Sequence, residues 1–297
     1  MVVKKYVRDG LGHLPLYLQL LSARLISCLE SIVQCLRIVR LRRQGMKEFI
    51  IPFGKYDCSM ECHILASGWS LNHSYVNIDR SKSFIMGFNF SFLKCQDPDL
   101  HFIENASVKD LRFFTNTAQV YFGLEKFDVF SSSKVVFKNL SELKNSLPLV
   151  RILYSKKAYF IKDRHFRIFG EGGVPPTVAR MCMDGKVLPQ TVSSVIGLVV
   201  LAKTMGFKKI VVHGLDFCGP HFYGADVSEI IFNGGDIPAP LNGDEVDSGL
   251  HKTAVGESGV GVVPVIKALK EELKAYDVDV FAASDISPSA EILGLPS

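Results

Sequence analysis

Apolar residues recur with a three-then-four spacing along the first part of the chain. Every position of this series between Leu14 and Val39 is apolar, and Pro15 stands where the first turn of a helix tolerates proline. The series occupies positions 14, 18, 21, 25, 28, 32, 35 and 39. This spacing predicts one long amphipathic helix with a continuous apolar face.

From about Phe49 onward, short apolar runs alternate with helical stretches. The predicted strands are 62–66, 83–87, 99–103, 118–122, 149–154, 209–213 and 278–282, and the predicted helices are 192–205 and 262–275. Such alternation is typical of a parallel sheet that is covered on both sides. We therefore expect an α/β fold with a single Rossmann-like, mostly parallel sheet and helices on both faces.

The segment 233–261 interrupts this pattern because it is rich in Gly, Asp and Pro and poor in apolar residues. A loop of that length in a compact domain is usually a lid, a binding loop or disordered. We divide the chain into a membrane-associating helix over 1–45 and an α/β domain over 46–297, with a lid at about 218–261.

The distribution of charge changes the interpretation of the first helix. The formal net charge is only +4, and the excess of basic residues lies at Arg24, Arg37, Arg40, Arg42, Arg43 and Lys47 against Glu30. The rest of the chain is close to neutral, which argues against a nucleic-acid partner that needs a broad basic face. A wide apolar face that ends in a cationic cluster suits an anionic lipid surface, which we expect residues 11–43 to contact.

Two other readings of this helix stay open. It could associate with a second copy in a homo-oligomer, or it could cross the membrane or pack within the molecule. Arg24, Glu30 and Gln34 leave no run of about 18 uncharged residues for a confident span. We expect peripheral attachment to the cytoplasmic, inner face of the cell membrane.

Cysteines and acidic pairs give no support for a metal or a disulfide framework. The seven cysteines are an odd number without framework spacing, which is typical of reduced cytosolic thiols. Cys58, Cys62 and His63 lack a second ligand pair with zinc spacing. Asp277-Val278-Asp279 precedes a predicted strand instead of ending one, and we interpret it as a turn. We expect neither a metal nor a cofactor.

Polar residues follow several predicted strands, where a parallel sheet binds its ligands. Gly68 and Ser70 follow the first strand, and Asn89, Asn105 and Asp216 follow later ones. Gly68 could let the backbone approach a phosphate, and Ser70 could cap the next helix and favour an anion there. The alternative is that glycine and serine only form a turn. Neither a dinucleotide nor a Walker fingerprint is present.

One histidine lies where a mobile loop could bring it to a ligand. His251 falls in the long polar segment, and a neutral imidazole is a competent proton acceptor near pH 7. His13, His63 and His213 give no indication of a catalytic role. His13 and His63 lack partner residues in the sequence, and His213 lies within an apolar strand.

Several motifs together resemble the bacterial sialyltransferases of glycosyltransferase family 42, which use CMP-activated sialic acid. The run ASGWSL at 66–71 is similar to the family's Gly-Asn-Gly-Pro-Ser-Leu, GFNF at 87–90 to Cys-Asn-Gln-Phe, and ENA at 104–106 to Tyr-Asn-Pro. SSVIGLVVLAKTMGFKKIVVHGLDF at 193–217 resembles the family's Ser-Gly helix and its Gly-Ile-Asp-Phe strand end. Tyr223, His251 and the closing SDISPSAEILGLP follow in the family's order.

The resemblance implies a metal-independent transferase with a lid. It implies that His251 deprotonates the acceptor hydroxyl and that Tyr223 stabilises the departing phosphate. It places the nucleotide and the donor against Gly68, Ser70, Asn89, Asn105, Ser194, Asp216, Ser287 and Pro288. Hydrogen bonds that strengthen as the leaving phosphate gains charge are physically suited to this reaction.

The chain departs from the family pattern at Ser67, Phe90, Thr191 and Cys218, which replace an asparagine, a glutamine, an arginine and a tyrosine. These changes affect the expected donor sugar more than the expected nucleotide. We therefore expect an inverting transferase that moves sialic acid or a related acidic sugar from a CMP donor to a cell-surface glycan or glycolipid. The alternatives are another nucleotide-dependent transferase, for example a pyrophosphokinase-like enzyme, and a non-catalytic membrane-bound oligomerising relative.

Overall fold

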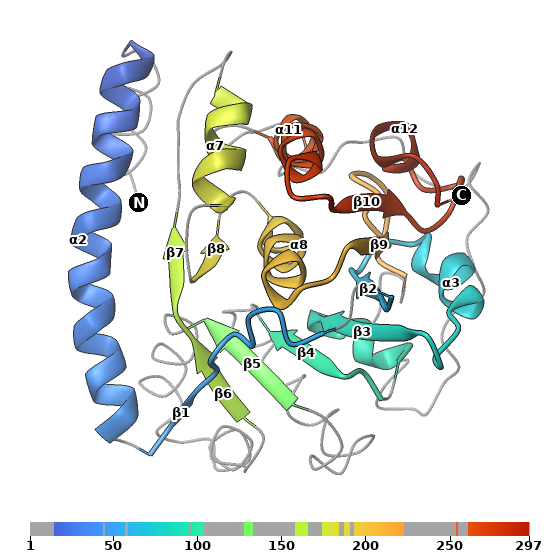
Figure 1. Cartoon of the computed structure of the whole chain (residues 1–297), viewed down its shortest axis with the longest axis horizontal. Helices are drawn as coiled ribbons and strands as arrows, with labels where there is room; N and C mark the ends of the chain where they lie inside the picture. The colour runs from blue at the N-terminus through green and yellow to red at the C-terminus, as the bar shows by residue number, and fades with distance from the viewer. Residues whose placement is uncertain are drawn as a thin grey trace.

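The computed structural model describes residues 15–43, 45–56, 59–95, 97–103, 128–132, 158–165, 174–183, 187–190, 193–222, 254 and 261–296 (Figure 1). The strands are β1 (Lys47–Glu48), β2 (Glu61–Leu65), β3 (Ser83–Phe88), β4 (Leu100–Ile103), β5 (Asp128–Ser132), β6 (Ala158–Ile161), β7 (Asp163–His165), β8 (Leu188–Gln190), β9 (Lys209–His213) and β10 (Asp279–Ala282). The helices are α2 (Leu16–Arg43), α3 (Leu71–Ser74), α7 (Val174–Met183), α8 (Ser194–Met205), α11 (Val262–Lys274) and α12 (Ala290–Leu293), with 3-10 turns η1 (Tyr75–Asn77) and η2 (Asn89–Leu93).

An eight-stranded sheet lies at the centre of the domain, with the order β1-β6-β5-β4-β3-β2-β9-β10. Every neighbouring pair in it is parallel, and β7 and β8 form a separate parallel pair. The α/β fold with a mostly parallel sheet is therefore confirmed. The strands β2, β3, β4, β9 and β10 lie within a residue or two of their predicted positions.

The alternation of side chains along the central strands builds two apolar layers. Cys62 and Ile64 of β2 face a large core that also contains most of α8 and α11, whereas Leu65 faces a smaller cluster with Leu71 and Ile85. Figure 1 shows α7, α8, α11 and α12 grouped on one side of the sheet and α3 apart from them. Because strands β2, β3 and β9 are buried on both faces, they read as continuous apolar runs.

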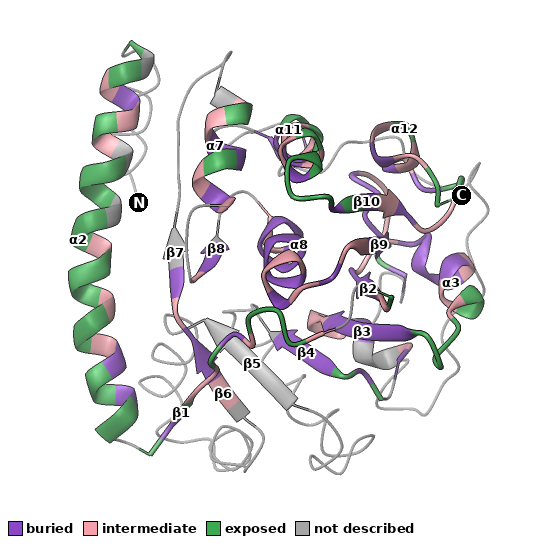
Figure 2. Ribbon diagram, viewed as in Figure 1, coloured by how far each residue is buried: buried purple, intermediate pink, exposed green. Residues whose placement is uncertain are grey.

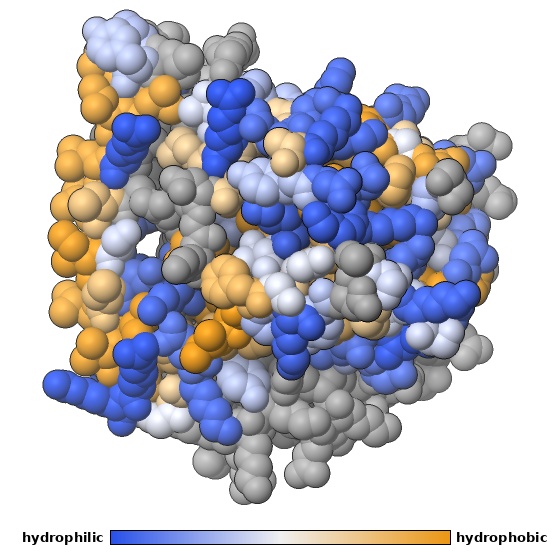
Figure 3. All heavy atoms as spheres, in the orientation of Figure 1, coloured by the Kyte–Doolittle hydropathy of each residue, from blue (hydrophilic) through white to orange (hydrophobic). Residues whose placement is uncertain are grey.

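Helix α2 packs along the sheet edge formed by β1 and β6 through a small part of its surface. Ile38 and Leu41 are buried in a cluster with Met46 and Phe160, and the side-chain amide of Gln34 donates to Asp163 Oδ1 at 3.0 Å. The predicted apolar series faces away from the domain. Leu25, for example, is 63% exposed. Figure 2 shows this outer side as exposed, and Figure 3 shows apolar atoms along it.

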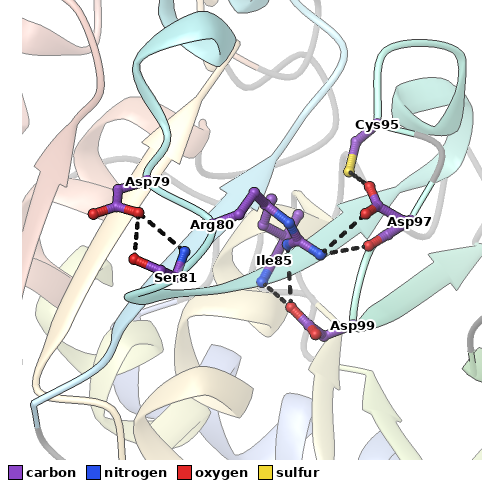
Figure 4. Close-up of polar contacts among 7 residues, drawn as sticks. All are labelled: Asp79, Arg80, Ser81, Ile85, Cys95, Asp97 and Asp99. Atoms are coloured by element: carbon purple, nitrogen blue, oxygen red, sulfur yellow. Dashed lines mark hydrogen bonds and ion pairs between the residues drawn. The ribbon is translucent and has the colours of Figure 1, made fainter.

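A cluster of charged residues fixes the amino-terminal ends of β3 and β4 (Figure 4). The Asp99 carboxylate accepts a hydrogen bond from the Ile85 backbone N–H at 2.7 Å, because β4 begins only at Leu100 and leaves that amide without a ladder partner. Arg80 pairs with Asp99 at 3.3 Å and with Asp97 at 3.6 Å. This cluster lies at the sheet edge opposite the carboxyl ends and serves the fold.

Two features were not expected from the sequence. Adjacent prolines such as Pro175 and Pro176 would suit an irregular loop, yet α7 begins at Val174 and holds both in its first turn, where a missing N–H costs nothing. Strands β1, β5, β6, β7 and β8 were not predicted. The predicted strands 118–122 and 149–154 lie outside the described residues. No helix in the described part of the chain combines the length and hydropathy that a bilayer crossing requires.

Candidate functional site

The order of the strands locates the region where a ligand is expected. From β2 the chain moves to β3 and β4 on one side of the sheet, and it later returns to β9 on the other side of β2. Open α/β sheets bind their ligands outside the carboxyl ends of the strands at such a switch point. The loops that follow β2 and β9 meet there.

Asp216, three residues after β9, joins three segments at this point. Its Oδ1 accepts hydrogen bonds from the Ser70 hydroxyl at 2.5 Å and the Ser287 hydroxyl at 2.8 Å, and its Oδ2 accepts from the Ser70 backbone N–H at 2.8 Å. The Ser289 hydroxyl lies 2.8 Å from that of Ser287. All four residues are buried. We call Ser70, Asp216, Ser287 and Ser289 the Asp216 cluster.

Gly68 is required by this cluster. A Cβ at Gly68 would collide with the Asp216 carboxylate and would lie 2.6 Å from the Gly214 carbonyl oxygen. The Gly68 backbone N–H donates to that same oxygen at 2.8 Å, and Gly214 adopts a φ of 65°. The space beside Gly68 that we expected for a phosphate is therefore filled by the chain's own carboxylate.

Ser70 does not cap a helix as expected. It occupies the N-cap position of α3 but makes no side-chain capping bond, because its hydroxyl donates to Asp216. The helix that follows has only four residues, and the Ser70 N–H is already taken by a carboxylate. The Asp216 carboxylate thus occupies the position predicted for an anion. The prediction that the Ser70 side chain caps the next helix is wrong.

Asn89 follows β3, next to β2, and adopts a left-handed conformation with a φ of 46°. Its backbone oxygen lies 2.8 Å from Nε2 of the buried His101. His101 occupies the space that a Cβ at Gly87 would need, and burial lowers the pKa of His101 to about 4. The side chain of His101 therefore supports the turn at Asn89. Asn89 itself is half-buried and lies at the carboxyl edge of the sheet.

Ser194 and Pro288 also lie at this edge. α8 ends at Met205 just before β9 and so runs against the strand direction, which puts Ser194 at the carboxyl side. The cap of α8 is Ser193, whose hydroxyl accepts from the Val195 N–H at 3.3 Å. Pro288 follows Ser287 and is half-buried. The structure thus brings Gly68, Ser70, Asp216 and Ser287 into contact, with Asn89, Ser194 and Pro288 on the same edge.

The remaining predicted site residues, Asn105, Tyr223 and His251, lie outside the described residues, as does Thr191. Most of the predicted lid lies outside them as well. The substituted residues Ser67, Phe90 and Cys218 are described and half-buried. The Ser67 carbonyl accepts from the Phe222 N–H at 3.0 Å, and Phe90 packs on the smaller apolar cluster.

A chain of buried polar side chains behind the site was not predicted. His63 Nδ1 lies 2.9 Å from His213 Nε2, His213 Nδ1 lies 2.9 Å from the Ser74 hydroxyl, and that hydroxyl lies 3.2 Å from the Ser70 carbonyl oxygen. His63 also lies 3.4 Å from Glu61. The register that puts His213 opposite Leu65 brings the two histidines diagonally together on one sheet face. Only the strand pairing could have shown this, since each histidine alone reads as a core residue.

The protonation of these histidines follows from their burial. Burial, together with a smaller effect of the neighbouring His63, lowers the pKa of His213 to about 3. Burial also lowers the pKa of His63, although Glu61 opposes that change. Both imidazoles are therefore neutral at pH 7 and act as hydrogen-bonding spacers between β2, β9 and the turn at Ser70.

The described residues contain no group of three side chains arranged to hold a metal ion. Asp277 lies in a left-handed turn before β10, as predicted for the Asp-Val-Asp segment. Asp216 accepts three hydrogen bonds and so holds loops together instead of offering a free base. What the described edge offers a ligand is backbone, hydroxyl and amide groups, which suits binding and orientation.

No protein-family model matches the chain, and neither does any curated protein. Solved structures that are similar include Campylobacter sialyltransferases. The sialyltransferase CstII from Campylobacter jejuni with the substrate analogue CMP-3FNeuAc is 14% identical, covering 80% of this chain and 86% of its own, with a TM-score of 0.46. The monofunctional alpha-2,3-sialyltransferase Cst-I from Campylobacter jejuni is 18% identical, covering 84% of each chain, with a TM-score of 0.45. Both TM-scores lie below 0.5 and both sequence identities lie below 25%.

Proposed function

We propose that the chain is a metal-independent, inverting glycosyltransferase of sialyltransferase type. It would transfer sialic acid or a related acidic sugar from a CMP donor to a glycan or glycolipid acceptor. The observation that carries this proposal is the Asp216 cluster at the switch point of the sheet. It unites residues from three motifs that resemble the sialyltransferase family, namely the loop at 66–71, the strand end at 214–217 and the closing turn at Ser287.

The roles within this proposal divide between binding and chemistry. The carboxyl edge that carries Gly68, Ser70, Asn89, Ser194, Asp216, Ser287 and Pro288 holds the nucleotide, mostly by fixing loops whose backbone faces it. Tyr223 and Asn105 contact the phosphate, and His251 accepts the proton of the attacking hydroxyl. Such a reaction needs donors placed where negative charge grows on the leaving phosphate, together with a base for the acceptor.

Calorimetric titration of the full chain with CMP in EDTA tests the proposal, with UDP, GDP and ATP as controls. Selective binding of CMP without a divalent cation is the expected result. Binding of another nucleotide only in the presence of Mg²⁺ would favour a different transferase, and the absence of any nucleotide binding would favour a non-catalytic role. Either outcome would overturn the sialyltransferase-type proposal.

The same proposal places the enzyme at the inner face of the cell membrane. Large apolar side chains of α2 are exposed, among them Leu21, Leu25, Ile32 and Leu36. The basic residues Arg40, Arg42 and Arg43 lie in its last turn. A lipid interface suits both the exposed apolar face and the basic last turn, because its apolar region accepts the former and its anionic headgroups attract the arginines.

Sedimentation with vesicles measures this association. We expect the full chain to bind vesicles that contain phosphatidylglycerol and to bind neutral phosphatidylcholine vesicles more weakly. If the chain instead forms a stable homo-oligomer that ignores vesicles, the helix is an oligomerisation surface and the membrane proposal is wrong.

A further inference from the structure

Two buried polar atoms in the loop after β2 have no hydrogen-bond partner among the residues that the structure describes. They are Nε1 of Trp69, whose residue is 3% exposed, and Oδ1 of Asn72, whose residue is 6% exposed. Buried polar groups in proteins are nearly always hydrogen-bonded, so each such atom calls for a specific explanation. Here a donor and an acceptor are left over in the same short turn, beside Gly68 and Ser70.

Trp69 and Asn72 belong to the same turn of the backbone. The Asn72 N–H donates to the Trp69 carbonyl at 3.2 Å, which makes residues 69 to 72 one helical turn. Side chains three apart in such a turn lie on the same face. The indole ring of Trp69 meets His73 edge-on, with ring centroids 6.3 Å apart, so the indole is held in place.

The carboxamide of Asn72 has a defined orientation. Its Nδ2 donates to the Phe222 carbonyl oxygen at 2.8 Å, and the reversed amide would set two oxygens against each other. The Phe222 N–H in turn donates to the Ser67 carbonyl at 3.0 Å. The contacts between the loop after β2 and the segment after β9 therefore fix the orientation of the Asn72 amide, and with it the position of Oδ1.

We infer that Trp69 Nε1 and Asn72 Oδ1 form a binding pair for the edge of a pyrimidine base. The pair offers one N–H donor and one oxygen acceptor, which complements a ligand edge with a neighbouring acceptor and N–H donor. In cytosine N3 would accept from Trp69, and the neighbouring exocyclic amino group would donate to Asn72. The inference rests on the proposed function, since that function supplies a CMP-activated donor to this edge of the sheet.

The position of the pair within the site supports this assignment. Trp69 stands between Gly68 and Ser70, both of which contact Asp216 at the switch point. If the base binds here, its ribose and phosphate extend toward the ends of the neighbouring strands. A water molecule that bridges the two atoms would also satisfy them, and the experiment must separate that arrangement from base recognition.

Trp69 is the only tryptophan of the chain, so its indole N–H gives a single signal in a ¹H–¹⁵N spectrum of the full-length protein. We expect CMP to move this signal downfield and to slow its exchange with solvent, whereas ribose 5-phosphate should leave it in place. A saturating concentration of CMP that leaves the signal unchanged would overturn the inference, and so would an equal response to ribose 5-phosphate. A bridging water predicts a protected signal that no nucleotide changes.

Substitution provides the second measurement. Asn72→Ser should weaken CMP binding about tenfold, the effect of one lost hydrogen bond, while Asn77→Ser at an exposed position of η1 should not change it. Trp69→Phe should weaken CMP binding similarly and remove the indole signal. Thermal unfolding of each variant shows whether it folds. Unchanged CMP affinity in a folded Asn72→Ser variant would overturn the inference.

The two proposals fail in different ways. If the wild-type chain binds no CMP by calorimetry, the proposed function fails, and cytidine, uridine and adenosine then test the pair directly through the indole signal. If CMP binds but the indole does not respond, the proposed function stands and the base lies elsewhere.

Discussion

A single carboxylate, that of Asp216, decides the conformation of three loops. The Ser70 N–H and two serine hydroxyls depend on it, and all are buried. Replacing the residue therefore removes more than one hydrogen bond, since each former donor is left without an acceptor in a dry environment.

Asp216→Asn is expected to lower the free energy of unfolding by about 2 kcal/mol, because an amide accepts poorly and brings two extra donors. Urea unfolding measures this change. The control is Asp285→Asn, an exposed carboxylate before Ser287, which should change stability by less than about 0.5 kcal/mol. Equal effects of the two substitutions would show that the Asp216 hydrogen bonds contribute nothing specific.

Buried histidines make the stability depend on pH. The pKa values of His101 and His213 lie at about 4 and about 3, below the value of about 6.5 that a histidine has in the unfolded chain. Below pH 6.5 the unfolded state therefore binds more protons. These histidines therefore leave stability unchanged above that pH and lower it below, by up to about 1.4 kcal/mol per pH unit for each histidine.

Urea unfolding between pH 7.5 and pH 4.5 checks this slope. His213→Gln keeps a hydrogen-bonding side chain and should reduce the slope on the acidic side. If the variant shows the same slope as the wild type, the acid sensitivity comes from other groups.

His251 carries the prediction that concerns activity. Its proposed role as the base for the acceptor hydroxyl comes from the resemblance, since it lies outside the described residues. His251→Ala should abolish sugar transfer and leave the affinity for CMP nearly unchanged, because a late proton acceptor does not touch the nucleotide. Loss of CMP binding in this variant would show that the residue belongs to the nucleotide site.

Among the secondary-structure elements, the beginning of β4 shows how side chains can extend a ladder. Asp99 replaces a strand partner for the Ile85 amide, whereas the Asp97 carboxylate pairs with Arg80 and accepts from the Cys95 thiol near the surface. The Asp99 side chain is 39% exposed and that of Asp97 is 70% exposed. Two nearby carboxylates that share one arginine therefore have different functions in the fold.

Asp99→Ala should destabilise the protein by about 1 to 2 kcal/mol, because a backbone N–H inside the sheet loses its acceptor. Asp97→Ala serves as the matched change and should cost less than about 1 kcal/mol, as is usual for an exposed ion pair. Chemical denaturation of both variants provides the comparison. If Asp97→Ala costs as much as Asp99→Ala, the arginine pair and not the backbone contact is what matters.

Substitutions on the exposed face of helix α2 leave its contacts with the domain at Ile38 and Leu41 intact. Ile32→Glu introduces a charge at an exposed apolar position, and Ser31→Glu introduces the same charge at the neighbouring exposed position. If the helix lies in a lipid interface, Ile32→Glu should reduce vesicle binding at least tenfold, because the buried area of an isoleucine is lost. Ser31→Glu should reduce it less. Equal losses in the sedimentation assay would point to simple charge repulsion.

For the whole molecule, the sequence pattern located the part of the sheet from β4 to β10 and missed the part formed by β1, β6 and β5. β2, β3, β9 and β10 were predictable because they are continuous apolar runs, and those of β2 and β9 end at Ser67-Gly68 and Gly214. β1, β7 and β8 have two or three residues each, too few for any periodicity. α7 was hidden by its two prolines, since the same residues that start a helix also suit a loop.

The site was predictable only in part for a related reason. Glycine, serine and aspartate after strands indicated the correct edge of the sheet, and Ser70, Asp216 and Ser287 do meet there. That Asp216 takes the position expected for an anion could not be inferred, because contacts between loops depend on the order of the strands. The pairing of His63 with His213 depends on the strand register in the same way.

The position of β1 determines when the chain can close during synthesis. Among the described strands β1 pairs with β6 alone, and Lys47 lies opposite Tyr159, so the edge against which α2 packs does not exist until that distant segment has been made. At a ribosomal rate of about 5 to 20 residues per second, the delay is on the order of ten seconds. During that interval both sides of α2 remain uncovered. A nascent chain therefore has time to reach a lipid surface, or to require a chaperone, before its own domain can cover any of the helix.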